Sequence, residues 1–84
     1  MQKASFIFFL LIGTSLLAQK SGDELYNLGK YKEAEAAYRQ ELKVSPNSYE
    51  LHMGYANSLH KQDLFEKAIE QYNVAEKLNK KDPE

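Results

Sequence analysis

Gly-Lys-Tyr-Lys-Glu-Ala-Glu-Ala-Ala-Tyr, residues 29–38, is the stretch that decides the fold, because its pattern returns further along the chain. When the chain is shifted against itself by 34 positions, Ala34 falls on Ala68 and Tyr38 falls on Tyr72. The other identical or similar pairs are Leu25 with Leu59, Lys43 with Lys77, Gly22 with Ala56, Tyr31 with Phe65 and Val44 with Leu78. A fixed period of this length is typical of a solenoid built from repeated helical hairpins.

The spacing of the apolar residues predicts amphipathic helices, because apolar side chains recur every three to four positions. These helices cover residues 31–45, 49–61 and 65–78. In the last of them the predicted apolar stripe consists of Phe65, Ala68, Ile69, Tyr72 and Ala75. No stretch alternates with a period of two, so we predict an all-α fold.

The turns and helix starts agree with this pattern. A shorter helix comes first, with Ser21 and Glu24 as its candidate capping box. Gly29 is suited to a left-handed turn, and Asp63 tolerates the same geometry in the turn of residues 62–64. Residues 46–48 end the helix before them, with Asn47 or Ser48 capping the next one. Loops this short predict antiparallel helical hairpins.

The pattern resembles the tetratricopeptide repeat (TPR), whose 34-residue unit is a pair of helices. Residues 29–38 are similar to the turn and second helix of one unit, and Pro46 stands where the closing proline belongs. The resemblance implies a TPR-like α-solenoid fragment of about two units: a partial unit over residues 19–48 and a full unit over residues 49–82. The residues expected to pack these helices together are Gly22, Tyr31, Ala34, Tyr38, Pro46, Ala56, Phe65, Ala68, Tyr72 and Ala75.

Some positions depart from the TPR pattern. Glu41 replaces a small residue, His52 replaces a bulky aromatic residue, and Lys80 replaces a second proline. Residues 25–48 also resemble, more narrowly, the opening repeat of exported bacterial TPR proteins associated with aerotolerance.

Residues 1–18 have the order of a secretory signal peptide: Lys3, then the apolar run Phe6–Leu17, then Ala18. As a helix this run spans about 18 Å, which is short of the ~30 Å hydrocarbon core of a bilayer. We therefore expect an exported protein, periplasmic or secreted, that begins at Gln19 or Lys20. The alternative is an uncleaved segment that anchors the protein in a membrane.

The composition excludes several kinds of chemistry. The chain contains no cysteine, so it has no disulfide framework and no thiolate metal site. The formal net charge is −1, and acidic and basic residues are interleaved, so no basic patch for nucleic acid is expected. His52 and His60 are about 12 Å apart along one predicted helix and cannot share a metal ion. We expect no enzyme activity, no cofactor and no small-molecule substrate.

A binding surface remains as the expected functional feature. The TPR resemblance implies that the first helix of each unit lines a concave side. On a helical wheel, one face of residues 49–61 lies opposite the apolar stripe. The shift of the chain by 34 positions adds the equivalent residues of the preceding unit to this face, namely Asp23, Tyr26 and Asn27. The candidate groove residues are Tyr26, Glu50, Met53, Asn57, His60 and Lys61. TPR domains take extended or helical peptides into this groove. Gly54 and Asp23 occupy the positions that a Lys/Asn clamp for a C-terminal carboxylate would need, so we do not expect that mode.

Two functions follow from this interpretation. The first is a non-catalytic exported module that binds a protein partner through the concave face. The second is a structural or assembly element that docks through its open terminal helix onto further helical repeats, its own copies or a larger envelope complex. We expect the outer face of that helix to include Ile69, Val74 and Leu78.

Overall fold

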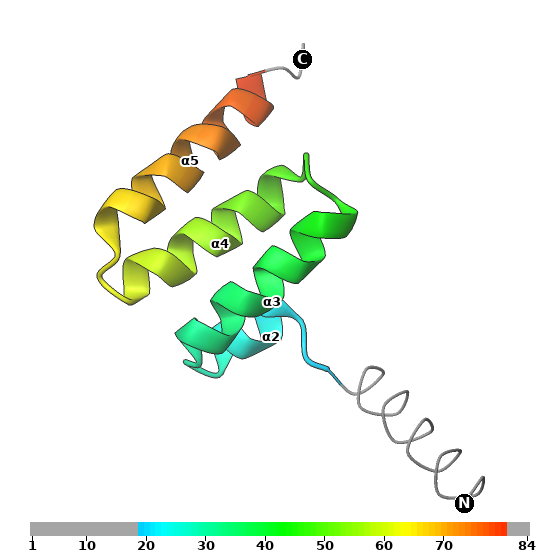
Figure 1. Cartoon of the computed structure of the whole chain (residues 1–84), viewed down its shortest axis with the longest axis vertical. Coiled ribbons are helices and arrows are strands. Elements are labelled where there is room, and N and C mark those ends of the chain that lie inside the picture. Colours follow the sequence, from blue (N-terminus) through cyan, green and yellow to red (C-terminus); the bar gives the residue numbers. More distant parts are fainter. Residues whose placement is uncertain (1–18, 81–84) are drawn as a thin grey trace, which may run out of the picture.

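A computed structural model describes residues 19–80 of this protein, and all of its secondary structure there is helical (Figure 1). The elements are α2 (Gly22–Asn27), α3 (Tyr31–Val44), α4 (Tyr49–Lys61) and α5 (Phe65–Lys80). Each of the three longer helices begins at the residue that the apolar spacing predicts, and α5 continues slightly past its predicted end. The proposed signal peptide and the last four residues lie outside the described part of the chain.

Side-chain caps fix where two of the helices begin. Ser21 Oγ accepts a hydrogen bond from the backbone N–H of Glu24 at 3.1 Å, and the Ser21 N–H donates to Glu24 Oε1 at 3.0 Å. This confirms the predicted capping box of α2. At α4 the cap is Ser48, whose Oγ accepts from the Leu51 N–H at 3.2 Å. Ser48, and not Asn47, therefore starts the helix.

The two hairpin turns have the same geometry, one repeat apart. Gly29 has a φ of 79°, and Asp63, at the equivalent position of the next repeat, has a φ of 63°. Both turns close with a backbone hydrogen bond of the same span, from the Lys30 N–H to the Leu25 carbonyl and from the Leu64 N–H to the Leu59 carbonyl. This bond satisfies a carbonyl that the end of the helix leaves free.

The core is made of small residues at the contacts between helices. Each helix packs against the next one in the chain, and α2 also contacts α4. Figure 1 shows α3, α4 and α5 side by side with alternating direction. The buried apolar residues are Ala34, Tyr38, Ala56, Leu59, Ala68 and Ala75. Alanine lets the helix axes approach closely, and the larger Tyr38 and Leu59 fill the space between them.

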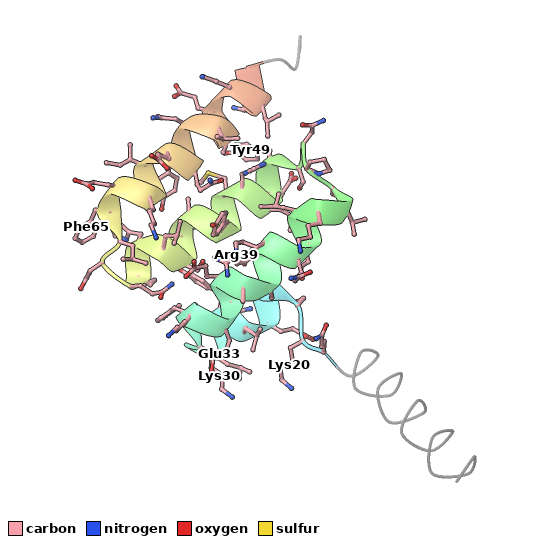
Figure 2. All side chains as sticks on the ribbon, in the orientation of Figure 1. Lys20, Lys30, Glu33, Arg39, Tyr49 and Phe65 are labelled. Carbon is pink, nitrogen blue, oxygen red and sulfur yellow. The ribbon has the colours of Figure 1, made fainter. Side chains whose placement is uncertain are left out.

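The predicted apolar stripe of α5 is divided between two environments: Ile69 is exposed, as expected for the outer face of the helix, whereas Phe65 is exposed although it was expected to pack between helices. Ala68 and Ala75 are buried against α4, whereas Phe65 is 50% exposed and Ile69 is 56% exposed. Figure 2 shows the Phe65 ring projecting outward at the turn between α4 and α5. The reason is that, within the described chain, no helix packs on the far side of α5. Val74 is about 140° from Ile69 around α5, so these two side chains do not share a face.

Candidate binding pocket between α2 and α4

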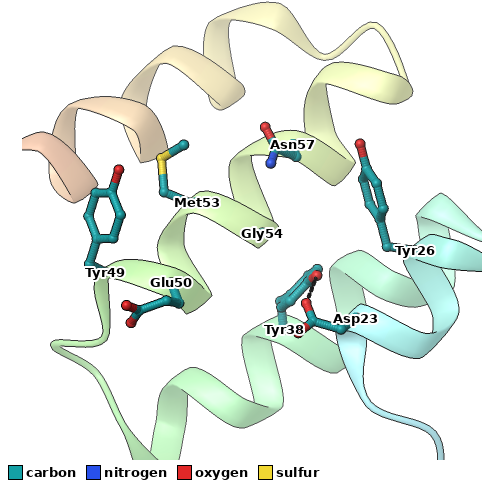
Figure 3. A pocket seen from close by; sticks show the side chains of 8 residues that line it. All are labelled: Asp23, Tyr26, Tyr38, Tyr49, Glu50, Met53, Gly54 and Asn57. Atoms are coloured by element: carbon teal, nitrogen blue, oxygen red, sulfur yellow. Dashed lines mark hydrogen bonds between the residues drawn. The ribbon is translucent and has the colours of Figure 1, made fainter.

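A concave pocket of about 330 Å³ lies where α2 and α4 run beside each other (Figure 3). Its lining residues come mainly from α4, with others from α2 and one ring from α3. They are Asp23, Tyr26, Tyr38, Tyr49, Glu50, Met53, Gly54 and Asn57. Helices α2 and α4 thus form the walls, and the ring from α3 closes the floor.

The floor of the pocket is the ring of Tyr38, which is held between two glycines. A Cβ atom added at Gly22 would lie 2.5 Å from Tyr38 Cδ1, and one added at Gly54 would lie 2.5 Å from Tyr38 Cζ. Such distances are well inside van der Waals contact, so α2 and α4 can both touch this ring only because these residues have no side chain. Tyr38 is 2% exposed as a result.

A hydrogen bond from the Tyr38 hydroxyl fixes the first wall of the pocket. The hydroxyl donates to Asp23 Oδ1 at 2.5 Å. Burial raises the pKa of the Tyr38 hydroxyl above its usual value, and the bond to Asp23 raises the pKa further. One repeat later Tyr72 donates to Asn57 Oδ1, also at 2.5 Å. Each unit therefore ties its second helix to its first through one tyrosine hydroxyl.

Two tyrosine rings flank the opening of the pocket on opposite sides in Figure 3. The ring of Tyr26 stands edge-on to the ring of Tyr31, with centroids 5.1 Å apart. Lys61 Nζ lies over the Tyr31 ring, 5.8 Å from its centroid. The edge-on contact with Tyr31 favours this orientation of the Tyr26 ring. Tyr49 is the first residue of α4 and is partly exposed beside the pocket.

Comparison with protein-family models matches residues 20–83 to the family described as tetratricopeptide repeat. The chain belongs to the tetratricopeptide repeat family. Comparisons with the curated proteins and with the solved structures gave no significant match. TPR domains generally mediate protein–protein interaction and are generally non-catalytic.

The pocket between α2 and α4, called the TPR pocket from here on, brings together four of the six residues that we expected in the groove. Tyr26, Glu50, Met53 and Asn57 line it. The other two, His60 and Lys61, do not line it. His60 packs its ring against Phe65, with centroids 5.3 Å apart, which repeats the pairing of Tyr26 with Tyr31 one unit later.

Two tyrosines of the TPR pocket are absent from the groove that the sequence predicts. Tyr49 lies about 100° before Glu50 on the helical wheel, just outside the face that the wheel selects. The sequence pattern assigns Tyr38 to packing alone, although its ring and hydroxyl also border the pocket. The shift by one repeat could have found the Tyr38 contact, because it pairs Asp23 with Asn57 and Tyr38 with Tyr72.

The residues expected to pack the TPR helices have three environments. Six of them are buried: Gly22, Ala34, Tyr38, Ala56, Ala68 and Ala75. Tyr31 and Tyr72 are partly exposed, and Phe65 and Pro46 are exposed. The carbonyl of Pro46 lies 2.8 Å from His52 Nε2, and His52 Nδ1 lies 2.9 Å from Gln71 Oε1. His52 thus links the loop before α4 to α5 through polar contacts at a position where the family prefers an aromatic side chain.

Within residues 19–80 we find no group of three histidine or acidic side chains placed to hold a metal ion. The helices of this same region are each too short or too polar to cross a membrane. The lining of the TPR pocket offers two carboxylates, an amide, a thioether and tyrosine rings around an open cavity.

Proposed function

We propose that this protein is a non-catalytic interaction module that binds a segment of a partner protein in the pocket between α2 and α4. The observation that supports this most is the convergence of Tyr26, Tyr49 and Met53 on one cavity. Aromatic residues and methionine are the side chains enriched at protein interfaces. A cavity of about 330 Å³ lies at the small end of ligand sites. It suits one anchoring side chain, with the rest of the segment lying across α2 and α4.

The pocket is also prepared for binding before a partner arrives. Gly22 and Gly54 enclose the Tyr38 ring at the floor, and the Tyr26 ring packs edge-on against Tyr31. Side chains that are already ordered lose less conformational entropy on association, which costs about 0.5–1.5 kcal/mol for each side chain that must be immobilised. More of the contact energy then appears as affinity.

Site-specific photocrosslinking in the producing cells tests this function. A photoreactive phenylalanine analogue is placed at Met53 in the pocket or, as a control, at the exposed Glu70 on α5. We expect a discrete adduct from position 53 and none from position 70. Tyr26→Ala should reduce the adduct, whereas Lys32→Ala, on the exposed side of α3, should leave it unchanged. Equal adducts from both positions would argue against binding in the pocket.

A second candidate function rests on the open face of α5. Glu35 of α3 accepts a hydrogen bond from Gln62 Nε2, which follows the end of α4, at 2.9 Å. In the first unit, the position of Glu35 on the second helix therefore contacts the unit that follows. Ile69 stands one repeat after Glu35 and is 56% exposed. We propose, as the alternative, that α5 docks onto a further helical repeat, a second copy of the chain or a larger envelope complex.

We also propose that the protein is exported to the periplasm or secreted. The motivation is the order of Lys3, Phe6–Leu17 and Ala18 in the sequence. Cleavage after Ala18 or Gln19 would leave the capping box of Ser21 and Glu24 in the mature chain. N-terminal sequencing of the exported protein should read Gln19 or Lys20 first. A chain that keeps Phe6–Leu17 and sediments with membranes would instead support the uncleaved anchor.

A further inference from the structure

We infer that the pocket between α2 and α4 takes an arginine side chain from a segment of the partner protein. This inference rests on the proposed binding function and adds the chemistry of the partner. It is carried by the charge of the pocket and by its tyrosine rings.

The pocket carries negative charge without a compensating base. Asp23 and Glu50 line it, and no lysine, arginine or histidine does. Asp23 uses Oδ1 for the Tyr38 hydroxyl, and Glu50 Oε1 accepts one long hydrogen bond, of 3.5 Å, from the Ser48 hydroxyl. Among the side chains of residues 19–79 neither carboxylate forms an ion pair. Both therefore keep acceptor oxygens for a donor that comes from outside.

The helix ends do not cancel this charge. Asp23 and Glu50 lie in the first turns of α2 and α4, where a helix N-terminus carries at most about half a positive charge. Because α2 has only six residues, its contribution is smaller still. Two full negative charges outweigh these partial charges, so the pocket favours a cation. A C-terminal carboxylate would meet like charge in the same place.

The rings around the pocket favour a cation as well. A cation within about 6 Å of a tyrosine ring is attracted by the negative face of the ring. This protein already makes such a contact, since Lys61 Nζ lies 5.8 Å from the Tyr31 centroid. Tyr26 and Tyr49 flank the pocket and offer further rings.

Arginine suits this combination better than lysine does. The planar guanidinium group can stack on a tyrosine ring and donate two parallel hydrogen bonds to one carboxylate. Its apolar stem would lie against Met53. Lysine offers a compact ammonium group that can meet a carboxylate but does not stack in this way.

Binding of defined peptide pools to the full 84-residue chain tests the inference. Three pools of short fluorescent peptides differ only in a central arginine, glutamine or glutamate. The flanking positions are randomised over uncharged residues, and both ends are blocked so that they carry no charge. Affinity is measured by fluorescence anisotropy at low and at high salt. We expect the arginine pool to bind about tenfold more tightly than the glutamine pool, which corresponds to about 1.4 kcal/mol. The glutamate pool should bind least, and salt should weaken only the arginine pool.

The pocket variant is Asp23→Asn combined with Glu50→Gln. It removes both charges and keeps the fold, because Asn57 already shows that an asparagine accepts the tyrosine hydrogen bond at this position of a unit. The matched control, Glu66→Gln with Glu70→Gln, removes two charges from the exposed side of α5. We expect the pocket variant to lose the preference for arginine and the control to retain it.

The other outcomes separate the two proposals. All three pools could bind with equal affinity, and Tyr26→Ala could weaken the binding of each. That result would overturn the arginine preference and leave peptide binding in the pocket intact. Binding of the arginine pool that the pocket variant does not change would also overturn the inference, because the cation would then bind elsewhere. If no pool binds, both the inference and the proposed function of this pocket fail.

Discussion

Tyr38 is the residue on which the packing of three helices depends. It comes from α3, lies between Gly22 of α2 and Gly54 of α4, and donates its hydroxyl proton to Asp23. A glycine in a helix costs about 1 kcal/mol relative to alanine. This protein places one in α2 and one in α4 at the two points where the Tyr38 ring leaves no room for a methyl group.

Gly54→Ala should therefore destabilise the protein, although alanine is the better helix former. The new Cβ would lie 2.5–2.7 Å from Cζ, Cε1 and the hydroxyl oxygen of Tyr38. Overpacking of this kind costs roughly 1–3 kcal/mol, which exceeds the gain of ~1 kcal/mol in helix propensity. We expect a lower urea midpoint with an unchanged slope.

A double-mutant comparison isolates the cause of that loss. In a Tyr38→Leu background the atoms that clash with the added methyl group are absent, so Gly54→Ala should cost less there than in the parent protein. An equal cost in both backgrounds would show that the ring is not what excludes the methyl group.

The raised pKa of Tyr38 predicts a loss of stability at alkaline pH. An unfolded tyrosine ionises near pH 10, whereas burial and the bond to Asp23 keep the folded hydroxyl protonated above that pH. The unfolded state then binds fewer protons than the folded state, so the free energy of unfolding falls as pH rises above about 10. Below that pH this contribution is fully present. Melting temperatures followed by circular dichroism from pH 8 to pH 11 should show the decline.

Tyr38→Phe should make this alkaline decline shallower. Tyr72→Phe is the matched comparison and should change the slope less, because Tyr72 is partly exposed and its partner Asn57 is uncharged. Identical slopes for the parent protein and Tyr38→Phe would mean that other groups cause the decline.

At the scale of single elements, α2 shows how a helix of six residues is kept folded. A helix this short is unstable by itself in water. Besides the Ser21 capping box, the backbone N–H of Gly22 donates to Glu41 Oε2 of α3 at 2.9 Å. Glu41 departs from the small residue that the TPR pattern prefers, and this hydrogen bond gives the departure a structural role.

Glu41→Ala should accordingly destabilise the protein by about 1 kcal/mol, since hydrogen bonds to charged groups contribute about 1.5–3 kcal/mol and this one is only part-buried. The amides of α2 should exchange with solvent faster than those of α4. Glu70→Ala, at an exposed position on α5, should stay within ~0.5 kcal/mol of the parent protein. If the amides of α2 exchange at the same rate in Glu41→Ala as in the parent protein, the Glu41 hydrogen bond does not stabilise α2.

The limits of the helices were predictable from the sequence because local signals determine them. Ser21, Ser48, Gly29 and Asp63 act on neighbouring backbone, so their types at those positions suffice. The residues of the pocket could not be predicted from the helical wheel of α4 alone. A wheel places Lys61 on the same face as Met53, but Lys61 reaches the Tyr31 ring of another helix, and no pattern within α4 contains that contact.

At the scale of the whole molecule, the last helix of the described residues, α5, packs against α4 on one side and against no other helix. Phe65 and Ile69 are each about half exposed on α5, at positions that correspond to Tyr31 and Glu35 of the preceding unit. In a solenoid each unit buries its apolar face against a neighbour. The open side of α5 therefore predicts association when the protein is concentrated.

Analytical ultracentrifugation of residues 19–84 over a range of concentrations tests this association. We expect the average mass to rise with concentration and Ile69→Lys to weaken association about tenfold or more, as the loss of ~1.4 kcal/mol of apolar burial would do. Val44→Lys is the matched control, because Val44 is 84% exposed at the end of α3. A parent protein that stays monomeric throughout would remove the support for docking through α5.

The paired hydrogen bonds of Tyr38 to Asp23 and of Tyr72 to Asn57 have a consequence for how such a chain can evolve. Aspartate and asparagine codons differ by a single base, and either side chain accepts the tyrosine proton. A point mutation at this position can therefore switch the charge that one unit presents to a ligand while the helices stay in register. Natural selection can change which ligand the surface attracts separately from the scaffold that supports it.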